Sequence, residues 1–281
     1  MLRNPDAIST VLERVDNWSA PHAAAAVFDH SGILVSHGST DRNFAVASIT
    51  KIVSAWAVLV AIEEQSVRLD DPAGPEGSTV RHLLCHASGL PFEGFDPIAG
   101  PGQRRIYSNS GYFALAEHLE GRTGMSFRDY MAEAVLEPLG MGASALVDGA
   151  AAGLQSTLED IVSLGIELLT PRVIDPSTHA MATSVNMAGL AGVLPGWGSY
   201  EDCAWGLGPE IRGTKTPHWM GETAPASTFG HFGGRGSFLW VDPDAGFGCV
   251  VATDRAFDDW AVNAWPRFSD DLRVAVRASF D

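Results

Sequence analysis

The sequence is short of lysine. Among its 18 Lys and Arg residues only Lys51 and Lys215 are lysines, whereas Asp and Glu together number 34. The formal net charge is therefore −16. This charge argues against a nucleic-acid backbone or an anionic membrane surface as a partner, because like charges repel. We expect neither nucleic acid nor a membrane to bind this chain.

Long apolar runs and an export signal are also missing. The most apolar run, residues 52–62, is interrupted by Ser54 and is much shorter than the about 20 residues that cross a bilayer. The first 18 residues contain neither an apolar core nor a small-residue cleavage site. Cysteine is rare, and the odd number and wide spacing of Cys85, Cys203 and Cys249 fit reduced thiols better than disulfides. We therefore predict a cytoplasmic protein.

The patterns that are present predict strands towards both ends of the chain. Residues 22–38 indicate two strands around a turn at His30, Ser31 and Gly32. Further strands are predicted at residues 204–211, 227–232, 237–242 and 246–254. A helix is predicted at each terminus, one over residues 8–18 with Ser9 or Thr10 as its cap, and one that begins at Pro266.

The middle of the chain has a different pattern. In residues 70–195 short helical patterns alternate with loops, no clear strand signal is present, and Ser156-x-x-Glu159 forms a capping box. The predicted fold class is therefore α/β plus all-α, with an antiparallel sheet flanked by helices, built from both chain ends, and an inserted helical lobe. Residues 1–281 would form a single unit. Its α/β lobe would comprise residues 1–68 and 200–281, and its helical lobe residues 69–199.

Lys51 is conspicuous because it lies inside the apolar stretch FAVASITKIVSAWAVLVAI, residues 44–62. A helix is predicted from Ser48 or Thr50 to about Gln65, and Ser48 and Lys51, three residues apart, would share one of its faces. Burial and the helix dipole both favour the neutral amine, which can activate the neighbouring hydroxyl as a nucleophile. The alternative is a lysine that merely extends from a core helix to solvent.

Two further motifs carry polar groups suited to catalysis. Tyr107 and Asn109, in a polar turn before a helix, could relay a proton and hold an amine, although this segment could simply cap the helix. His231, Phe232 and Gly233 end a predicted strand, and the glycines around them allow a backbone N–H to approach a substrate oxygen. The alternative there is a glycine-rich hairpin with an incidental histidine.

The order S-x-x-K, Y-x-N and H-x-G resembles the serine β-lactamase and penicillin-binding-protein superfamily, above all its class C branch with the related esterases and D-amino-acid peptidases. Residues 69–91, 153–169 and 204–211 are similar to further segments of that family. The resemblance implies a β-lactamase/transpeptidase-like fold and a small-molecule ester, amide or lactam substrate. It implies no metal and no organic cofactor.

The resemblance also implies the role of each residue. Ser48 would attack a carbonyl and form an acyl-enzyme, Lys51 would accept its proton, and Tyr107 would pass a proton to the leaving group. Asn109 would orient Lys51 and the substrate, and His231 would contact the tyrosine or the substrate from the place that lysine takes in β-lactamases. The backbone N–H groups of Ser48 and Gly234 would form the oxyanion hole.

Phe232, Gly233 and Arg235 are the predicted substrate-binding residues, and they bear on the choice of substrate. A K-T-G triad binds the carboxylate of penicillins with the hydroxyl of its threonine and the charge of its lysine. Phe232 lacks that hydroxyl, and a neutral His231 lacks that charge. We therefore expect a carboxylesterase that acts on small neutral esters. The alternatives are a β-lactamase or a D-Ala-D-Ala-type peptidase or amidase, with Arg235 supplying the charge, and a protein that is acylated without turnover as a sensor.

Two other clusters imitate functional motifs. Lys215-Thr216-Pro217 is close to K-T-G, but proline lacks the N–H that the glycine supplies. His82, Cys85 and His86 could suggest zinc, but no fourth ligand is nearby in the sequence, and the family resemblance accounts for this segment as a helix and a turn. No serine lies in G-x-S-x-G, which removes an α/β-hydrolase.

Overall fold

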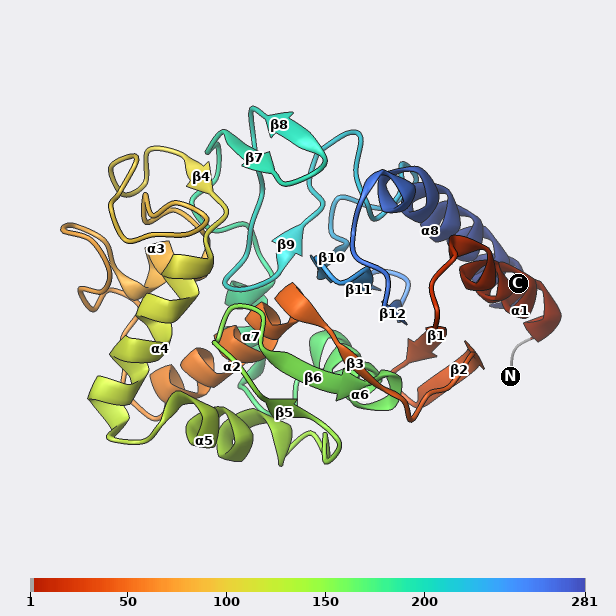
Figure 1. The fold of residues 1–281 in the computed structure, drawn as a ribbon, viewed down its shortest axis with the longest axis horizontal. Helices are drawn as coiled ribbons and strands as arrows, with labels where there is room; N and C mark the ends of the chain where they lie inside the picture. The colour runs from red at the N-terminus through yellow and green to blue at the C-terminus, as the bar shows by residue number, and fades with distance from the viewer. Residues whose placement is uncertain (1–2, 281) are drawn as a thin grey trace.

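The computed structural model describes residues 3–280, apart from the side chain of Phe280. A six-stranded sheet has the order β2-β1-β12-β11-β10-β9, with every neighbouring pair antiparallel. Its strands are β1 (Ala23–Asp29), β2 (Gly32–His37), β9 (Glu210–Ile211), β10 (Phe229–Gly233), β11 (Ser237–Asp242) and β12 (Phe247–Thr253). Because β1 pairs directly with β12, the prediction of an antiparallel sheet built from both chain ends is confirmed (Figure 1).

Helices cover both faces of this sheet. On one face α1 (Pro5–Leu12) and α8 (Asp259–Phe280) lie side by side, and Phe268 of α8 packs edge-on against Phe238 of β11 (Figure 1). On the other face α6 (Leu158–Leu169) contacts β1 and β12. There the ring of Phe28 lies 2.2 Å from where a Cβ at Gly165 would stand, so only glycine allows this close packing.

The predicted apolar helix is α2 (Thr50–Glu63), preceded by a 3-10 turn at Ala47–Ile49. Nearly all of α2 is buried, as expected for a helix that is apolar on every side. The remaining helical segments surround it or connect to it: a 3-10 turn (Glu13–Trp18), α3 (Val80–Leu84), α4 (Asn109–Thr123), α5 (Phe127–Met131), a π-helical turn (Ala132–Leu136) and α7 (Pro176–Ala182). No helix within residues 3–280 is long and apolar enough to span a membrane.

The expectation that residues 70–195 lack strands is wrong. Two small three-stranded sheets use this part of the chain, β3-β6-β5 and β4-β7-β8. Their strands are β3 (Asn43–Ala45), β4 (Arg105–Ile106), β5 (Ala145–Leu146), β6 (Leu154–Thr157), β7 (Gly192–Leu194) and β8 (Gly198–Tyr200). Each has only two to four residues, too few for an alternating pattern to stand out. The division into lobes at residues 69 and 199 stays a prediction.

Several predicted boundaries are also wrong. Helix α1 is capped by Asn4 with Pro5 at its first position, a favoured arrangement, instead of by Ser9 or Thr10. Thr157, one residue after the predicted Ser156, caps α6 by accepting a hydrogen bond from the N–H of Asp160 at 3.2 Å.

The predicted strand at residues 204–211 shrinks to Glu210–Ile211, because Gly208, at φ 114°, turns the chain. Helix α8 begins at Asp259 and contains Pro266 in its interior. Proline removes one helical hydrogen bond, but Trp265 and Phe268 beside it are buried in the core, which holds the segment helical.

Candidate active site

Ser48 lies in the 3-10 turn that leads into α2, at a bend that the surrounding structure fixes. Ala47, just before it, has φ 46°, in the left-handed region that costs an alanine of order 1 kcal/mol. Thr50 holds this bend, because its Oγ1 donates to the carbonyl of Ala47 at 2.5 Å and accepts from the N–H of Leu154 at 3.0 Å. A strained backbone at a reactive side chain is typical of functional sites.

Lys51 is fully buried, and its amine has three polar neighbours. Nζ lies 2.7 Å from Oδ1 of Asn109, 2.9 Å from the carbonyl oxygen of Ala151 and 3.3 Å from Oγ of Ser48. Burial holds the pKa of Lys51 well below its ordinary value. A neutral amine has two N–H bonds for the two carbonyl-type acceptors, and its lone pair is then free for the Ser48 hydroxyl. This is the arrangement of a general base beside a nucleophile.

Tyr107 and His231 come from distant parts of the sequence, and their side chains contact each other beside Lys51. The phenolic oxygen lies 3.5 Å from Nε2 of His231, and the amine of Lys51 lies 4.8 Å from the centre of the Tyr107 ring. Burial raises the pKa of Tyr107, and a hydrogen bond with Ser48 opposes this to a smaller extent. Burial, with the nearby Lys51, lowers the pKa of His231 to about 3. Tyr107 is thus a neutral phenol and His231 a neutral imidazole at pH 7.

The end of β10 packs directly against the residues before Ser48. A side chain at Gly233 would collide with the carbonyl oxygen of Val46, 2.3 Å from its Cβ, whereas the space around Gly234 is open. The absence of a side chain at Gly233 therefore lets β10 approach the turn before Ser48. The next residue, Gly234, is exposed. Arg235 is exposed in the β10–β11 turn. These positions leave room for a ligand next to Gly234.

Phe232 lies differently from what the sequence suggested. The residue is only 8% exposed, and its ring packs against Trp219, Phe257 and Trp265 at centroid distances of 5.1 to 5.7 Å. Successive residues of a strand point to opposite faces of the sheet. His231 therefore faces the site, whereas Phe232 packs mainly against α8. A direct apolar contact of Phe232 with a substrate would be limited to a small edge of the ring.

His86, which sequence reasoning considered only as a zinc ligand, supports the site. Its Nδ1 accepts from the N–H of Ser108 at 3.1 Å, and its ring lies 4.6 Å from that of Tyr107. His82 instead completes the capping box of Thr79, and Cys85 donates to the carbonyl of Arg81. Among residues 3–280 no group of His, Cys, Asp or Glu is arranged to hold a metal ion. The role of His86 depends on a contact over 22 residues, which its local sequence does not reveal.

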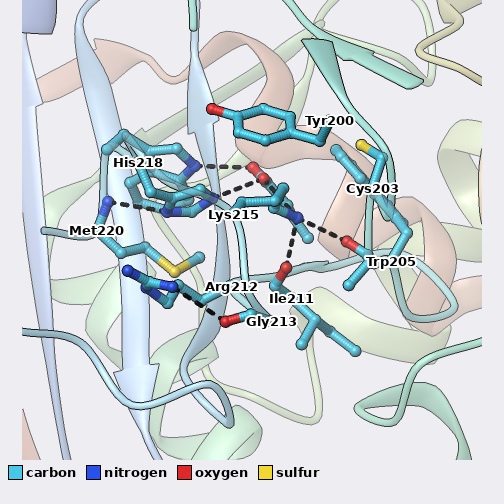
Figure 2. Close-up of polar contacts among 12 residues, drawn as sticks. Tyr200, Cys203, Trp205, Ile211, Arg212, Gly213, Lys215, His218 and Met220 are labelled. Atoms are coloured by element: carbon cyan, nitrogen blue, oxygen red, sulfur yellow. Dashed lines mark hydrogen bonds and ion pairs between the residues drawn. The ribbon is translucent and has the colours of Figure 1, made fainter. Parts of the chain in front are cut away.

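The second lysine, Lys215, belongs to a buried charged cluster (Figure 2). Nζ of Lys215 lies 3.0 Å from Oε1 of Glu210, and this carboxylate also lies 2.8 Å from Nε2 of His218 and accepts from Nε1 of Trp219 at 2.7 Å. These partners lower the pKa of Glu210 to about 2 against the opposing effect of burial. Lys215 therefore serves a structural ion pair.

Comparisons with known proteins agree with this geometry. The family model described as Beta-lactamase matches residues 9–271. A crystal structure described as a beta-lactamase from Mycobacterium bovis is 48% identical to this chain and has a TM-score of 0.92. The match covers 95% of this chain and 99% of that protein's chain.

Two other matches are more distant. Penicillin-binding protein 4* of Bacillus subtilis (strain 168) is 29% identical over a match of 135 residues, and the match covers 36% of this chain and 30% of that protein. The structure of EstCE1, described as a hydrolase with promiscuous acyltransferase activity, has a TM-score of 0.76 at 17% identity and covers 95% of this chain and 97% of its own. At that identity the likeness concerns the fold alone.

Proposed function

This chain belongs to the beta-lactamase family, and we propose that it is a serine hydrolase that forms an acyl-enzyme on Ser48 and acts as a carboxylesterase on small neutral esters. The observation that carries the proposal is the set of contacts around one amine. A buried, neutral Lys51 has Asn109 and Ala151 as hydrogen-bond acceptors and keeps its lone pair for Ser48, at 3.3 Å.

The proposed reaction begins with attack of Ser48 Oγ on the ester carbonyl while its proton passes to Nζ of Lys51. The resulting oxyanion accepts hydrogen bonds from the backbone N–H groups of Ser48 and Gly234. Tyr107, whose raised pKa keeps the phenol protonated, gives its proton to the departing alkoxide. The phenolate then regains a proton from the Lys51 ammonium, which restores both groups. A water molecule attacks the acyl-enzyme by the same route and releases the acid and Ser48.

The preference for neutral esters rests on the charge of the site. With His231 neutral and Lys51 neutral, neither group next to Ser48 offers a cation to a substrate carboxylate. Removing a carboxylate from water without such a partner costs several kcal/mol. Arg235 is exposed, so its guanidinium is hydrated and would have to turn toward the site.

A second candidate is β-lactam hydrolysis. It is favoured by the name of the Mycobacterium bovis protein, a beta-lactamase that is 48% identical to this chain. In that case Arg235 would bind the β-lactam carboxylate, and the oxyanion hole and acyl-enzyme chemistry would be the same.

The test is a comparison of kcat/KM for p-nitrophenyl esters of varied acyl length, for nitrocefin and for a D-aminoacyl anilide. The esterase proposal expects the short neutral esters to react fastest, with Ser48→Ala inactive towards all substrates. If nitrocefin is hydrolysed as well as the best ester, and Arg235→Ala abolishes only that reaction, the second candidate is correct. A burst of product without steady turnover on every substrate would instead support a protein that is acylated as a sensor.

A further inference from the structure

An apolar pocket of about 360 Å³ opens beside Tyr107. Its lining consists of Phe92, Ile98, Arg104, Arg105, Ile106, Tyr107, Val193 and Pro195. Three of these are large apolar side chains that stay exposed, Phe92 at 49%, Ile98 at 65% and Val193 at 47%. A concave group of exposed apolar side chains next to polar catalytic groups is a typical ligand site.

The walls of this pocket are anchored to the catalytic segment. The carbonyl of Phe92 accepts from the N–H of Asn109 at 2.9 Å, and the ring of Phe92 stacks on that of Tyr107, with centroids 6.0 Å apart and planes at 22°. On the other side β4 pairs with β7 in parallel, with Ile106 opposite Val193. The pocket is therefore formed before any substrate binds, and its position relative to Tyr107 is fixed.

Tyr107 belongs both to this pocket and to the proposed proton relay, and this decides which part of a substrate the pocket would bind. Its hydroxyl lies near His231, while Tyr107 also lines the pocket and its ring stacks on that of Phe92. A proton donor must lie within hydrogen-bond distance of the leaving oxygen. The group attached to that oxygen is therefore the part of the substrate nearest the pocket, whereas the acyl group remains on Ser48.

We propose that this pocket is the leaving-group subsite, which binds the apolar alcohol portion of an ester, aryl or alkyl, with Phe92 as its specificity-determining residue. This proposal rests on the proposed esterase function. The stacked geometry of Phe92 on Tyr107 favours an aromatic alcohol such as benzyl over a short alkyl, because aromatic groups gain from offset or edge-on contacts with both rings.

The test compares ethyl, butyl and benzyl acetate with a second series in which ethanol is fixed and the acyl chain varies. For the wild type, kcat/KM should rise about tenfold from ethyl to benzyl acetate. Phe92→Ala should remove most of that rise and leave the acyl series unchanged. Val193→Phe, which fills the pocket from the opposite wall, should slow benzyl acetate and spare ethyl acetate. Phe95→Ala, an exposed aromatic residue outside this pocket's lining, is the matched control.

The outcomes separate the two proposals. If the wild type hydrolyses none of these esters, the esterase function fails and the subsite fails with it. If it hydrolyses them but the size of the alcohol has no effect, or if Phe92→Ala changes the acyl series instead, only the subsite is wrong. Equal losses in Phe92→Ala and Phe95→Ala would also overturn it.

A second inference concerns Trp205 and has an independent basis. The Trp205 ring lies 5.9 Å from the ring of Tyr107 and 5.8 Å from that of His231. Nζ of Lys215 also lies 5.8 Å from the Trp205 ring, and it donates to the carbonyl of Ala204 at 2.7 Å, just before Trp205 in the chain. Figure 2 shows Lys215 between His218 and Trp205. The lysine thus holds the backbone next to Trp205, and the indole N–H of Trp205 donates to the carbonyl of Gly208 at 3.1 Å.

We infer that Trp205 is a positioning residue for Tyr107 and that Lys215 holds it in place. Protonation by Tyr107 matters for a poor leaving group such as ethoxide, whereas p-nitrophenolate departs without a proton. Trp205→Leu should therefore lower kcat/KM for ethyl acetate by about a hundredfold, typical for loss of a general acid, and change that for p-nitrophenyl acetate little. Trp240→Leu, a buried tryptophan on the α8 side of the sheet, controls for lost volume. Equal losses on both esters, or none, would overturn the inference.

Discussion

The phenolic oxygen of Tyr107 lies 3.5 Å from Nε2 of His231, and the other nitrogen of the imidazole sets the direction of this contact. Nδ1 lies 2.7 Å from the carbonyl oxygen of Phe232, to which it can only donate. In the neutral ring Nε2 is then an acceptor, and the Tyr107 hydroxyl points its proton at it. A lysine in this place would instead donate to the phenolic oxygen and favour phenolate. The histidine therefore favours the neutral phenol, which is the form that the proposed proton transfer from Tyr107 requires.

Ser48 should be the residue that is acylated. A fluorophosphonate should label Ser48 in the wild type, and mass spectrometry of the digested protein should place the adduct there. Ser108 and Ser110 are buried, and Ser108 caps α4, so neither should react. Labelling of either, with Ser48 unmodified, would refute the assignment.

Lys51→Arg should lower kcat/KM for a short p-nitrophenyl ester by about a hundredfold or more, as for removal of a general base. The charge is kept, but a guanidinium remains protonated and cannot accept the Ser48 proton. Circular dichroism should verify that the variant is folded. An active Lys51→Arg protein with an unchanged pH profile would mean that the lysine is structural.

The pH dependence of kcat/KM should carry an acid limb from Lys51 and none from His231. Lys51 must be neutral to act as a base, so activity falls as the pH drops through its lowered pKa, and it is retained above that pKa. His231 stays neutral at every pH above about 3, so its titration should not affect activity near pH 6.5, its ordinary range. His231→Gln should leave the acid limb in place; its disappearance would assign that limb to the histidine.

His231→Lys should improve acylation by nitrocefin relative to that by a neutral ester. The new cation would give the β-lactam carboxylate a charge-assisted hydrogen bond, which corresponds to about a tenfold gain. Arg235→Ala in the wild type is the control and should barely affect ester turnover. Phe232 is best left unchanged in this test, because a smaller residue would open a cavity against Trp265. A fall in nitrocefin acylation would contradict the argument from charge.

Lys215→Met should destabilise the protein by about 3–5 kcal/mol, because it leaves the buried Glu210 carboxylate without its cation. Urea unfolding followed by circular dichroism measures the change in the free energy of unfolding. The double variant Lys215→Met with Glu210→Gln should recover part of the loss, since the uncompensated charge is gone. Stability equal to the wild type in the single variant would mean that Glu210 is neutral in the folded protein.

The sequence could predict those features that depend on neighbours along the chain. The strands of β1, β2, β11 and β12 follow from patterns within single segments, and the i, i+3 spacing of Ser48 and Lys51 puts their side chains on one face. Burial of α2 follows from its being apolar on every side, and burial decides the charge of Lys51. The family resemblance added Tyr107, Asn109 and His231 by their order in the sequence.

Only the tertiary structure decided which distant groups meet and which way they face. The carbonyl of Ala151, 100 residues from Lys51, supplies an acceptor that no motif marks. The face of Phe232 depends on the packing of α8, and Pro266 stays within a helix because its neighbours are buried. The pocket beside Tyr107 likewise exists because the pairing of β4 with β7 brings Val193 next to Ile106. Local sequence sets dihedral preferences and burial tendencies, but contacts between distant segments arise only when the whole core packs.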